Sequence, residues 1–272
     1  NEISPHLPAY CWGAALRRLL QAGSTGYQIL ATIHADAPAH PALGSTLADA
    51  SLFEELRVDP YYRTTAAAHP DLAPRFAALI EDMKRIEGDI MLLGVGGKMG
   101  PSLARLAMNA IAAAGVKKRV IGVSRFSSGG LREELEAAGV ETIACDLLDE
   151  EALAALPEVP NVIYMAGNKF GTTGREWFTW AMNSYLPGRV AEKFRRSRIV
   201  VFSSGNIYPF TPVAHGGATE ETPPEPVGEY AQSTLGRERM FEYFSHKYGI
   251  PMLMYRLNYA IDMRYGVLLE VA

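Results

Sequence analysis

The sequence predicts an α/β fold with a doubly wound parallel sheet. From residue 89 onward, short apolar runs alternate with longer stretches of helical periodicity, and several of the turns between them contain glycine. The runs are apolar throughout, which is typical of strands buried on both faces. Helices that follow such strands one by one connect parallel strands and cover both faces of the sheet. We therefore expect residues 71–272 to form one domain of this class.

The predicted elements follow one another in regular order. The strands are predicted at residues 90–94, 120–123, 142–145, 162–165, 199–202 and 252–256. The helices between them are predicted at residues 103–114, 131–138, 180–194 and 230–248, and one more precedes the first strand at residues 72–86. Asp71 is placed to cap that first helix and Gly88 to end it.

Residues 1–70 do not continue this pattern, and we expect them to form an extra N-terminal α/β segment of unknown role. Short helices are predicted at residues 12–21 and 51–57 and a strand at residues 27–33. His34, Asp36 and His40 are either metal ligands or polar surface residues at a strand end. Their spacing matches no strong metal-binding pattern, so we favour the second interpretation and expect no metal site.

The composition is that of an ordinary globular protein and predicts a cytoplasmic one. With 26 basic and 30 acidic residues the net charge is −4, which argues against nucleic acid or an anionic membrane as a partner. No apolar run approaches the roughly 20 residues that span a bilayer, and the first residues do not resemble a secretory signal. The two cysteines, Cys11 and Cys145, offer no disulfide framework and are expected to be reduced.

A glycine loop joins the first predicted strand of the domain to the helix that follows. It reads Gly94-Val95-Gly96-Gly97-Lys98-Met99-Gly100. In this context Gly94 permits a tight turn, Gly97 lets the backbone approach a pyrophosphate, and Gly100 lets helix and strand pack closely. The helix N-terminus then favours the anion. We expect the loop, with Gly96, Lys98 and Met99, to bind NADP or NAD; Met99 excludes a P-loop, which needs Ser or Thr there.

The ends of the next two strands bear on which dinucleotide binds. Ser124 and Arg125 follow the second strand, where an acidic residue would hydrogen-bond the adenosine ribose of NAD. A hydroxyl and a guanidinium suit a 2′-phosphate, so we predict a preference for NADP, the alternative being that Arg125 is a solvated loop residue. Asp146 ends the third strand and is a candidate partner for the adenine amino group.

Taken together, these motifs resemble the extended short-chain dehydrogenase/reductase superfamily, in particular the NAD-dependent epimerase/dehydratase family, over residues 89–272. The resemblance implies a Rossmann fold with further cofactor contacts after the third, fourth and sixth strands. It also implies an active site supported by an asparagine and containing a serine four residues before a tyrosine. The matching positions are Asp146-Leu147, Met165-Ala166-Gly167, Asn183, Ser204 and Asn258.

The family's catalytic signature is Tyr-x-x-x-Lys, and here it reads Tyr230-Ala-Gln-Ser-Thr234. The resemblance makes Tyr230 the proton-transfer residue, but Thr234 supplies only part of the lysine's hydrogen bonding to the cofactor ribose and none of its charge. A free tyrosine, with a pKa near 10, needs that charge at neutral pH. Three interpretations remain: Lys169 or Arg237 replaces the lysine, with Lys169 preferred; the charge of an oxidised nicotinamide suffices; or the chain binds the cofactor without chemistry.

The function implied is an NAD(P)-dependent oxidoreductase or sugar epimerase/dehydratase that transfers hydride at a hydroxyl or carbonyl carbon. The alternative is a weak or inactive NADP-binding sensor or scaffold. The substrate is a small molecule, such as a nucleotide sugar, and the family analogy suggests a homodimer. Little sequence follows the sixth strand, so we expect a truncated C-terminal substrate lobe, either in a fragment or in a protein with an unusual substrate side.

Overall fold

The computed structural model describes residues 72–127, 129–169, 171–211 and 217–258. The predictions for residues 1–70, including those for His34, Asp36 and His40, lie outside the described residues. The same holds for Asp71 as a helix cap and for residues 259–272, where a C-terminal lobe would begin.

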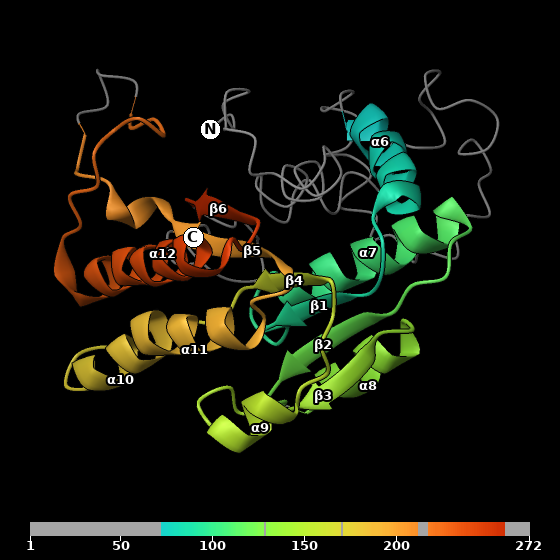
Figure 1. The fold of residues 1–272 in the computed structure, drawn as a ribbon, viewed down its shortest axis with the longest axis horizontal. Coiled ribbons are helices and arrows are strands. Elements are labelled where there is room, and N and C mark those ends of the chain that lie inside the picture. The colour runs from blue at the N-terminus through green and yellow to red at the C-terminus, as the bar shows by residue number, and fades with distance from the viewer. Residues whose placement is uncertain (1–71, 128, 170, 212–216, 259–272) are drawn as a thin grey trace, which may run out of the picture.

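The described residues form a six-stranded parallel sheet, which confirms the predicted fold class (Figure 1). The spatial order is β3-β2-β1-β4-β5-β6, so the winding direction reverses between β1 and β4. In open α/β sheets, ligands bind outside the carboxyl ends of the strands at such a switch point. The strands are β1 (Ile90–Leu93), β2 (Val120–Ser124), β3 (Glu141–Ala144), β4 (Asn161–Tyr164), β5 (Arg198–Ser204) and β6 (Met252–Leu257).

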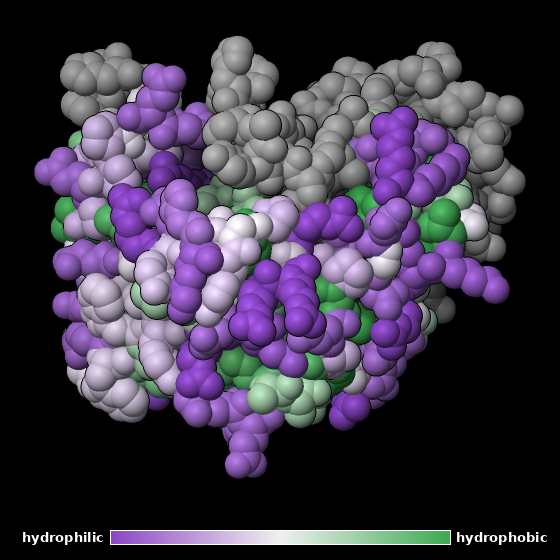
Figure 2. Space-filling model, viewed as in Figure 1, coloured by the Kyte–Doolittle hydropathy of each residue, from purple (hydrophilic) through white to green (hydrophobic). Residues whose placement is uncertain are grey.

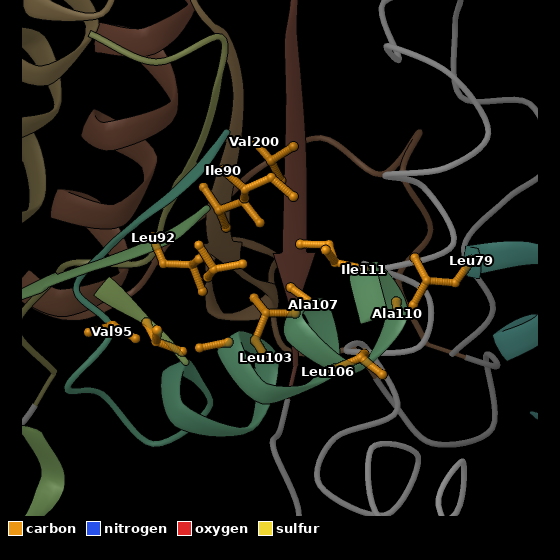
Figure 3. Packing of buried hydrophobic residues seen from close by; sticks show 14 of the residues in the cluster. Leu79, Ile90, Leu92, Val95, Leu103, Leu106, Ala107, Ala110, Ile111 and Val200 are labelled. Carbon is orange, nitrogen blue, oxygen red and sulfur yellow. The ribbon is translucent and has the colours of Figure 1, made fainter. Parts of the chain in front are cut away.

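The side chains of β1 show how an apolar strand holds two helix layers together. All four of its residues are fully buried. Ile90 and Leu92 belong to one hydrophobic cluster, and Met91 and Leu93 belong to the other, because successive side chains of a strand point to opposite faces. Figure 3 shows the first cluster, in which Ile90 and Leu92 lie beside residues of the helix that follows the glycine loop.

The helices divide between the two faces of the sheet. α6 (Leu72–Arg85), α7 (Gly100–Ala114) and α8 (Leu131–Ala137) contribute buried residues to the first cluster. α9 (Glu150–Ala155), α11 (Leu186–Lys193) and α12 (Gly228–Tyr248) contribute to the second. In Figure 1, α10 (Glu176–Trp180), α11 and α12 lie on the side of the sheet opposite α6 and α7.

Two features of the helices differ from the sequence prediction. α9 was not predicted, and it is a short helix whose N-cap, Asp149, accepts hydrogen bonds from Glu151 N and Ala152 N, both at 3.0 Å. The helix predicted at residues 180–194 begins earlier, at Glu176, and is interrupted by η2, a π-helical turn over Ala181–Tyr185. Such turns are rare and frequently mark functional sites.

The surface carries no sign of a membrane segment in the part of the chain that is described. None of the helices there combines the length and the apolar character that crossing a membrane requires. On the face seen in Figure 2, hydrophilic side chains predominate and hydrophobic ones form separate small areas.

Candidate functional site

The glycine loop lies between the carboxyl ends of β1, β2 and β4. Gly94 has φ +90°, a region that favours glycine, and a Cβ there would lie 2.7 Å from the backbone nitrogen of Ala166. A Cβ on Gly100 would overlap the carbonyl of Val95. Gly94 N and Val95 N both donate to Val123 O, at 2.9 and 3.1 Å. The two glycines are therefore required by the close approach of backbone to backbone.

The loop exposes its backbone and buries its two apolar side chains. Gly96, Gly97 and Lys98 are exposed, whereas Val95 and Met99 are buried in the first cluster. α7 starts directly after this stretch, with Met99 as an N-cap that makes no side-chain cap hydrogen bond. The free N–H groups and the dipole of a helix N-terminus favour an anion. The loop thus presents exposed backbone at the start of α7, while Gly97 N and Gly100 N donate within the loop to Gly94 O and Gly97 O and the side chain of Met99 anchors it in the core.

The two neighbours of Arg125, at the end of β2, fix the position of its backbone. Ser124 Oγ occupies the space that a Cβ on Gly96 would need, so the strand end touches the glycine loop. On the other side, Phe126 adopts φ +48°, an uncommon value for a non-glycine residue, while packing against the first cluster. Arg125, which is exposed, is held between these two anchored neighbours, next to the loop.

The end of β3 brings Asp146 and Leu147 to the same edge of the sheet. Cys145 N donates to Ser124 O at 2.9 Å, which continues the pairing of β2 with β3. Asp146 is exposed and accepts a hydrogen bond from Leu148 N at 3.0 Å, whereas Leu147 is buried. Burial, together with the charges of Asp146 and Asp149, raises the pKa of the Cys145 thiol, so this cysteine is held in its neutral form.

The turn after β4 packs against the glycine loop on one side and against α12 on the other. Met165 N donates to Leu93 O at 2.8 Å, and Ala166 is the residue that Gly94 approaches. A Cβ on Gly167 would overlap the Arg237 guanidinium and lie 3.0 Å from Asn183 Oδ1. Glycine is therefore required at 167 because charged and polar side chains from behind the turn fill the space.

Asn183 is the centre of a buried polar network. It lies in the π-helical turn and is fully buried. Its Oδ1 accepts from Asn168 N at 2.8 Å and from Arg237 Nη2 at 3.0 Å. Its Nδ2 donates to Asn168 O at 2.9 Å and to Ser233 Oγ at 3.0 Å. All four hydrogen-bonding positions of the amide are therefore used, and they tie the turn after β4 to α12.

Tyr230 stands in the first turn of α12 with Lys169 beside it. The Lys169 ammonium lies 5.6 Å from the centroid of the Tyr230 ring, within cation–π distance. Tyr230 is half-buried and Lys169 is exposed. Thr234 is fully buried and its hydroxyl donates to Tyr230 O at 2.8 Å. Contact with a cofactor, as predicted for Thr234, would require this region to open.

Ser204 ends β5 and begins a short turn, η3 (Gly205–Ile207). Its hydroxyl accepts from Asn206 N at 3.2 Å and donates to Asn206 Oδ1 at 3.1 Å. The side-chain amide of Asn258 fills the space where Gly205 would carry a Cβ. Ser204 and Asn258 thus meet at the carboxyl ends of β5 and β6, at the same edge of the sheet as the glycine loop.

One charged group in this region was not assigned a role from the sequence. Glu238 is fully buried. Its carboxylate accepts hydrogen bonds from Arg256 Nε at 3.0 Å, from Arg256 Nη2 at 2.8 Å and from Ser203 Oγ. Burial lowers the pKa of Arg256, but Glu238 and Tyr208 more than offset this, so the pKa of Arg256 lies above its usual value. Only its spacing from Tyr230 on one helix could have indicated Glu238.

No candidate metal site is found within the described ranges. No group of three or more His, Cys, Asp or Glu residues there is arranged to hold a metal ion. The polar groups gathered at the carboxyl edge are amides, hydroxyls and cations, with the separate carboxylates of Asp146 and Glu238.

The strand order and the glycine turn at the switch point define the class of this protein as a dinucleotide-binding fold of the Rossmann type. Residues 90–260 match the model of the NAD dependent epimerase/dehydratase family. The chain therefore belongs to the NAD-dependent epimerase/dehydratase family, as the sequence motifs indicated. No curated protein matches the sequence.

Solved structures of similar fold include sugar-nucleotide enzymes. The UDP-Glc/GlcNAc 4-epimerase of Campylobacter jejuni has a TM-score of 0.53 and 19% identity, over 64% of this chain and 53% of that one. The dTDP-glucose 4,6-dehydratase of Bacillus anthracis, solved with NAD, has a TM-score of 0.53 and 16% identity, over 62% and 54%. A UDP-glucuronic acid 4-epimerase of Bacillus cereus, also with NAD, has a TM-score of 0.50 and 17% identity, over 62% and 56%. At these identities the likeness shows the fold, and this chain spans little more than half the length of each structure.

Proposed function

We propose that this protein is an NAD(P)-dependent oxidoreductase or sugar epimerase/dehydratase. The observation that carries the proposal is the meeting of two sets of residues at one edge of the sheet. The glycine loop and α7 form an anion cradle at the switch point. Ser204 ends β5 at the same edge, and Asn183 holds the turn after β4 that packs on the glycine loop. Tyr230 stands in the first turn of α12, under Lys169 of the turn after β4.

The cofactor would be held by the exposed backbone of residues 96–98 at its pyrophosphate and by the ends of β2 and β3 at its adenosine. NADP is favoured because Arg125 is exposed next to the loop and offers charged donors to a 2′-phosphate. NAD is the alternative, and the related structures of Bacillus anthracis and Bacillus cereus were solved with it. When bound, the nicotinamide supplies the hydride acceptor or donor.

The chain's own residues would manage the proton and the substrate oxygen. Tyr230 would exchange a proton with the hydroxyl or carbonyl oxygen at the reacting carbon, and Ser204 would donate a hydrogen bond to the same oxygen. Lys169, 5.6 Å from the Tyr230 ring centroid, would place a positive charge beside the phenol, in the role of the family's lysine. Asn183 would keep the turn after β4 and α12 in register.

The proposed substrate class is a nucleotide sugar. The support is the family membership and the titles of the similar structures, which name UDP- and dTDP-sugars. A cytoplasmic location, predicted from the cysteines, fits soluble substrates of this kind.

The second candidate function is that of a cofactor-binding sensor or scaffold without hydride transfer. It is favoured by Thr234, whose buried hydroxyl is used within its own helix and brings no charge to the phenol of Tyr230. Such a protein would bind NADPH but show no turnover with any sugar nucleotide.

We also propose a homodimer. Four large aromatic side chains are exposed on α10, η2 and α12, and their burial in a symmetric interface would remove apolar surface from water. They are Trp177, Trp180, Tyr185 and Tyr243, with exposed fractions of 69%, 39%, 51% and 56%.

The two functions are separated by turnover of UDP-glucose, UDP-glucuronic acid and dTDP-glucose in the presence of NAD or NADP. For an enzyme, Tyr230→Phe should lower kcat by about a hundredfold or more, the range expected for loss of a general acid–base group. Tyr248→Phe, at the far end of the same helix, is the matched control and should leave kcat unchanged. Turnover that survives Tyr230→Phe would overturn the assignment, and turnover absent from the unaltered protein would favour the sensor.

A further inference from the structure

A buried cation stands one helical turn beyond the position where the family's lysine is missing. Thr234 is uncharged, and its hydroxyl donates to the backbone of Tyr230 at 2.8 Å. Arg237 follows three residues later, a spacing that places both side chains on one side of the helix. Arg237 is only 5% exposed. A side chain of this kind is almost never buried without a specific reason.

The partners of Arg237 are neutral. Its Nη1 donates to Phe202 O at 2.7 Å and its Nη2 to Asn183 Oδ1 at 3.0 Å, while the guanidinium lies 5.6 Å from the centroid of the Tyr164 ring. The neighbouring carboxylate, Glu238, is paired with Arg256 instead. Among the residues that the structure describes, no ion pair includes Arg237, and its Nε is buried without a hydrogen-bond partner. A guanidinium is therefore buried among neutral groups, an arrangement that is costly unless the side chain has a specific role.

The guanidinium is also placed where it can act on the proposed active site. It fills the space beneath Gly167, in the turn that follows β4. Through Asn183 it is linked to both backbone groups of Asn168, the residue directly before Lys169. Lys169 in turn stands over the Tyr230 ring. A continuous set of contacts thus runs from Arg237 to the catalytic tyrosine by way of Asn183 and the Lys169 turn.

We infer that Arg237 is a positioning residue that provides, one turn further along α12, the fixed positive charge that Thr234 lacks. It orients the Asn183 amide, because a cationic donor at Oδ1 keeps this oxygen toward Asn168 N and, with it, Nδ2 toward Asn168 O. That orientation holds the Lys169 turn against Tyr230. The inference rests on the proposed function for its catalytic consequence, but the positioning role itself can be measured without cofactor or substrate.

The first test is amide hydrogen exchange at Asn168 in the cofactor-free protein, comparing Arg237→Met with the unaltered chain. Loss of a hydrogen bond to a charged group should speed exchange at Asn168 by about tenfold to a hundredfold. Arg239→Met, which removes an exposed arginine that pairs with Glu242 on the same helix, is the control and should leave the rate unchanged. Equal rates at Asn168 in the two variants would overturn the inference. If Arg237→Met does not fold, Arg237→Gln gives the same test, because it removes the charged donor from Asn183 Oδ1 while keeping a polar side chain.

The second test moves the positive charge from residue 237 to residue 234 and measures turnover of the three sugar nucleotides. Arg237→Met should lower kcat at least tenfold while changing the Kd for NADPH or NADH less than about threefold, and Arg237→Lys should recover part of the loss. Thr234→Lys alone should bring no gain, because it adds a second cation beside Arg237, whereas Thr234→Lys combined with Arg237→Met should exceed Arg237→Met at least tenfold. A gain from Thr234→Lys alone, with no loss from Arg237→Met, would overturn the inference. If the unaltered protein turns over none of these substrates, the proposed function fails, and the exchange rates alone decide the role of Arg237.

Discussion

The buried pair of Glu238 with Arg256 gives the sharpest prediction about stability. Glu238 is fully buried and accepts two hydrogen bonds from Arg256, while the side chain of Arg256 is 22% exposed. Glu238→Gln preserves the shape of the side chain but leaves the charge of Arg256 without its counter-ion. Breaking a buried pair from one side costs about 3–5 kcal/mol. Because Gln still accepts hydrogen bonds and Arg256 reaches water, we expect a loss of about 2–3 kcal/mol in the free energy of unfolding.

The assay is urea unfolding followed by circular dichroism, with Glu242→Gln as the control. Glu242 pairs with Arg239 on the same helix, and their side chains are 41% and 56% exposed. An exposed pair contributes about 0–1 kcal/mol. The reasoning would be refuted if the two variants lost the same free energy of unfolding, because burial would then not distinguish the pairs.

Three further predictions concern pH, cofactor choice and assembly. Partial burial acts to raise the pKa of Asp89, but the hydrogen bonds and charge of Arg119 outweigh it and hold that pKa below its usual value. The stabilisation is therefore complete above the unfolded value of about 3.9 and is lost as the pH falls through the lower folded value. Asp89→Asn should accordingly lower the thermal midpoint at neutral pH, and the difference from the unaltered chain should vanish in acid; a difference that persists there would contradict this. Arg125→Ala should weaken NADPH binding about tenfold or more, the worth of a charge-assisted contact, and NADH binding little, as measured by fluorescence titration; equal losses would show that Arg125 does not contact the 2′-phosphate. Trp177→Glu places a charge in the proposed dimer interface and should halve the mass measured by light scattering, while an unaltered mass would exclude this face.

The parallel sheet was predictable because its central strands, β1, β2 and β4, are buried on both faces. Ile90 and Leu92 serve one core and Met91 and Leu93 the other, so no polar position interrupts the run. Gly94 and Gly100 were equally readable, because backbone atoms of Ala166 and Val95 lie where any side chain would be. These requirements arise within one strand or between the ends of neighbouring parallel strands. They restrict the residue type at single positions, so they can be recognised in the sequence.

The features that were missed depend on contacts between distant segments. The π-helical turn at Ala181–Tyr185 has no residue signature, and the side chain of its Asn183 bonds to Asn168 and Ser233, which are distant in sequence. α9 is too short for an apolar periodicity to be visible. An arginine in a helix suggests exposure, and only the packing of Gly167, Phe202 and Asn183 around Arg237 shows that it is buried.

The central claim is that the carboxyl edge of this sheet binds a nicotinamide dinucleotide and uses it. The most direct measurement follows both the absorbance of reduced nicotinamide and the conversion of the sugar when the protein, loaded with NADP or NAD, is mixed with UDP-glucose, UDP-glucuronic acid or dTDP-glucose. Net oxidation would accumulate reduced nicotinamide, whereas epimerisation or dehydration returns the hydride and changes only the sugar. We expect at least one of these signals in the unaltered protein and in Tyr248→Phe, and its loss in Tyr230→Phe. Tight binding of either dinucleotide with neither reduced nicotinamide nor a converted sugar from any of the three would contradict the claim that the site carries out hydride transfer on these sugars.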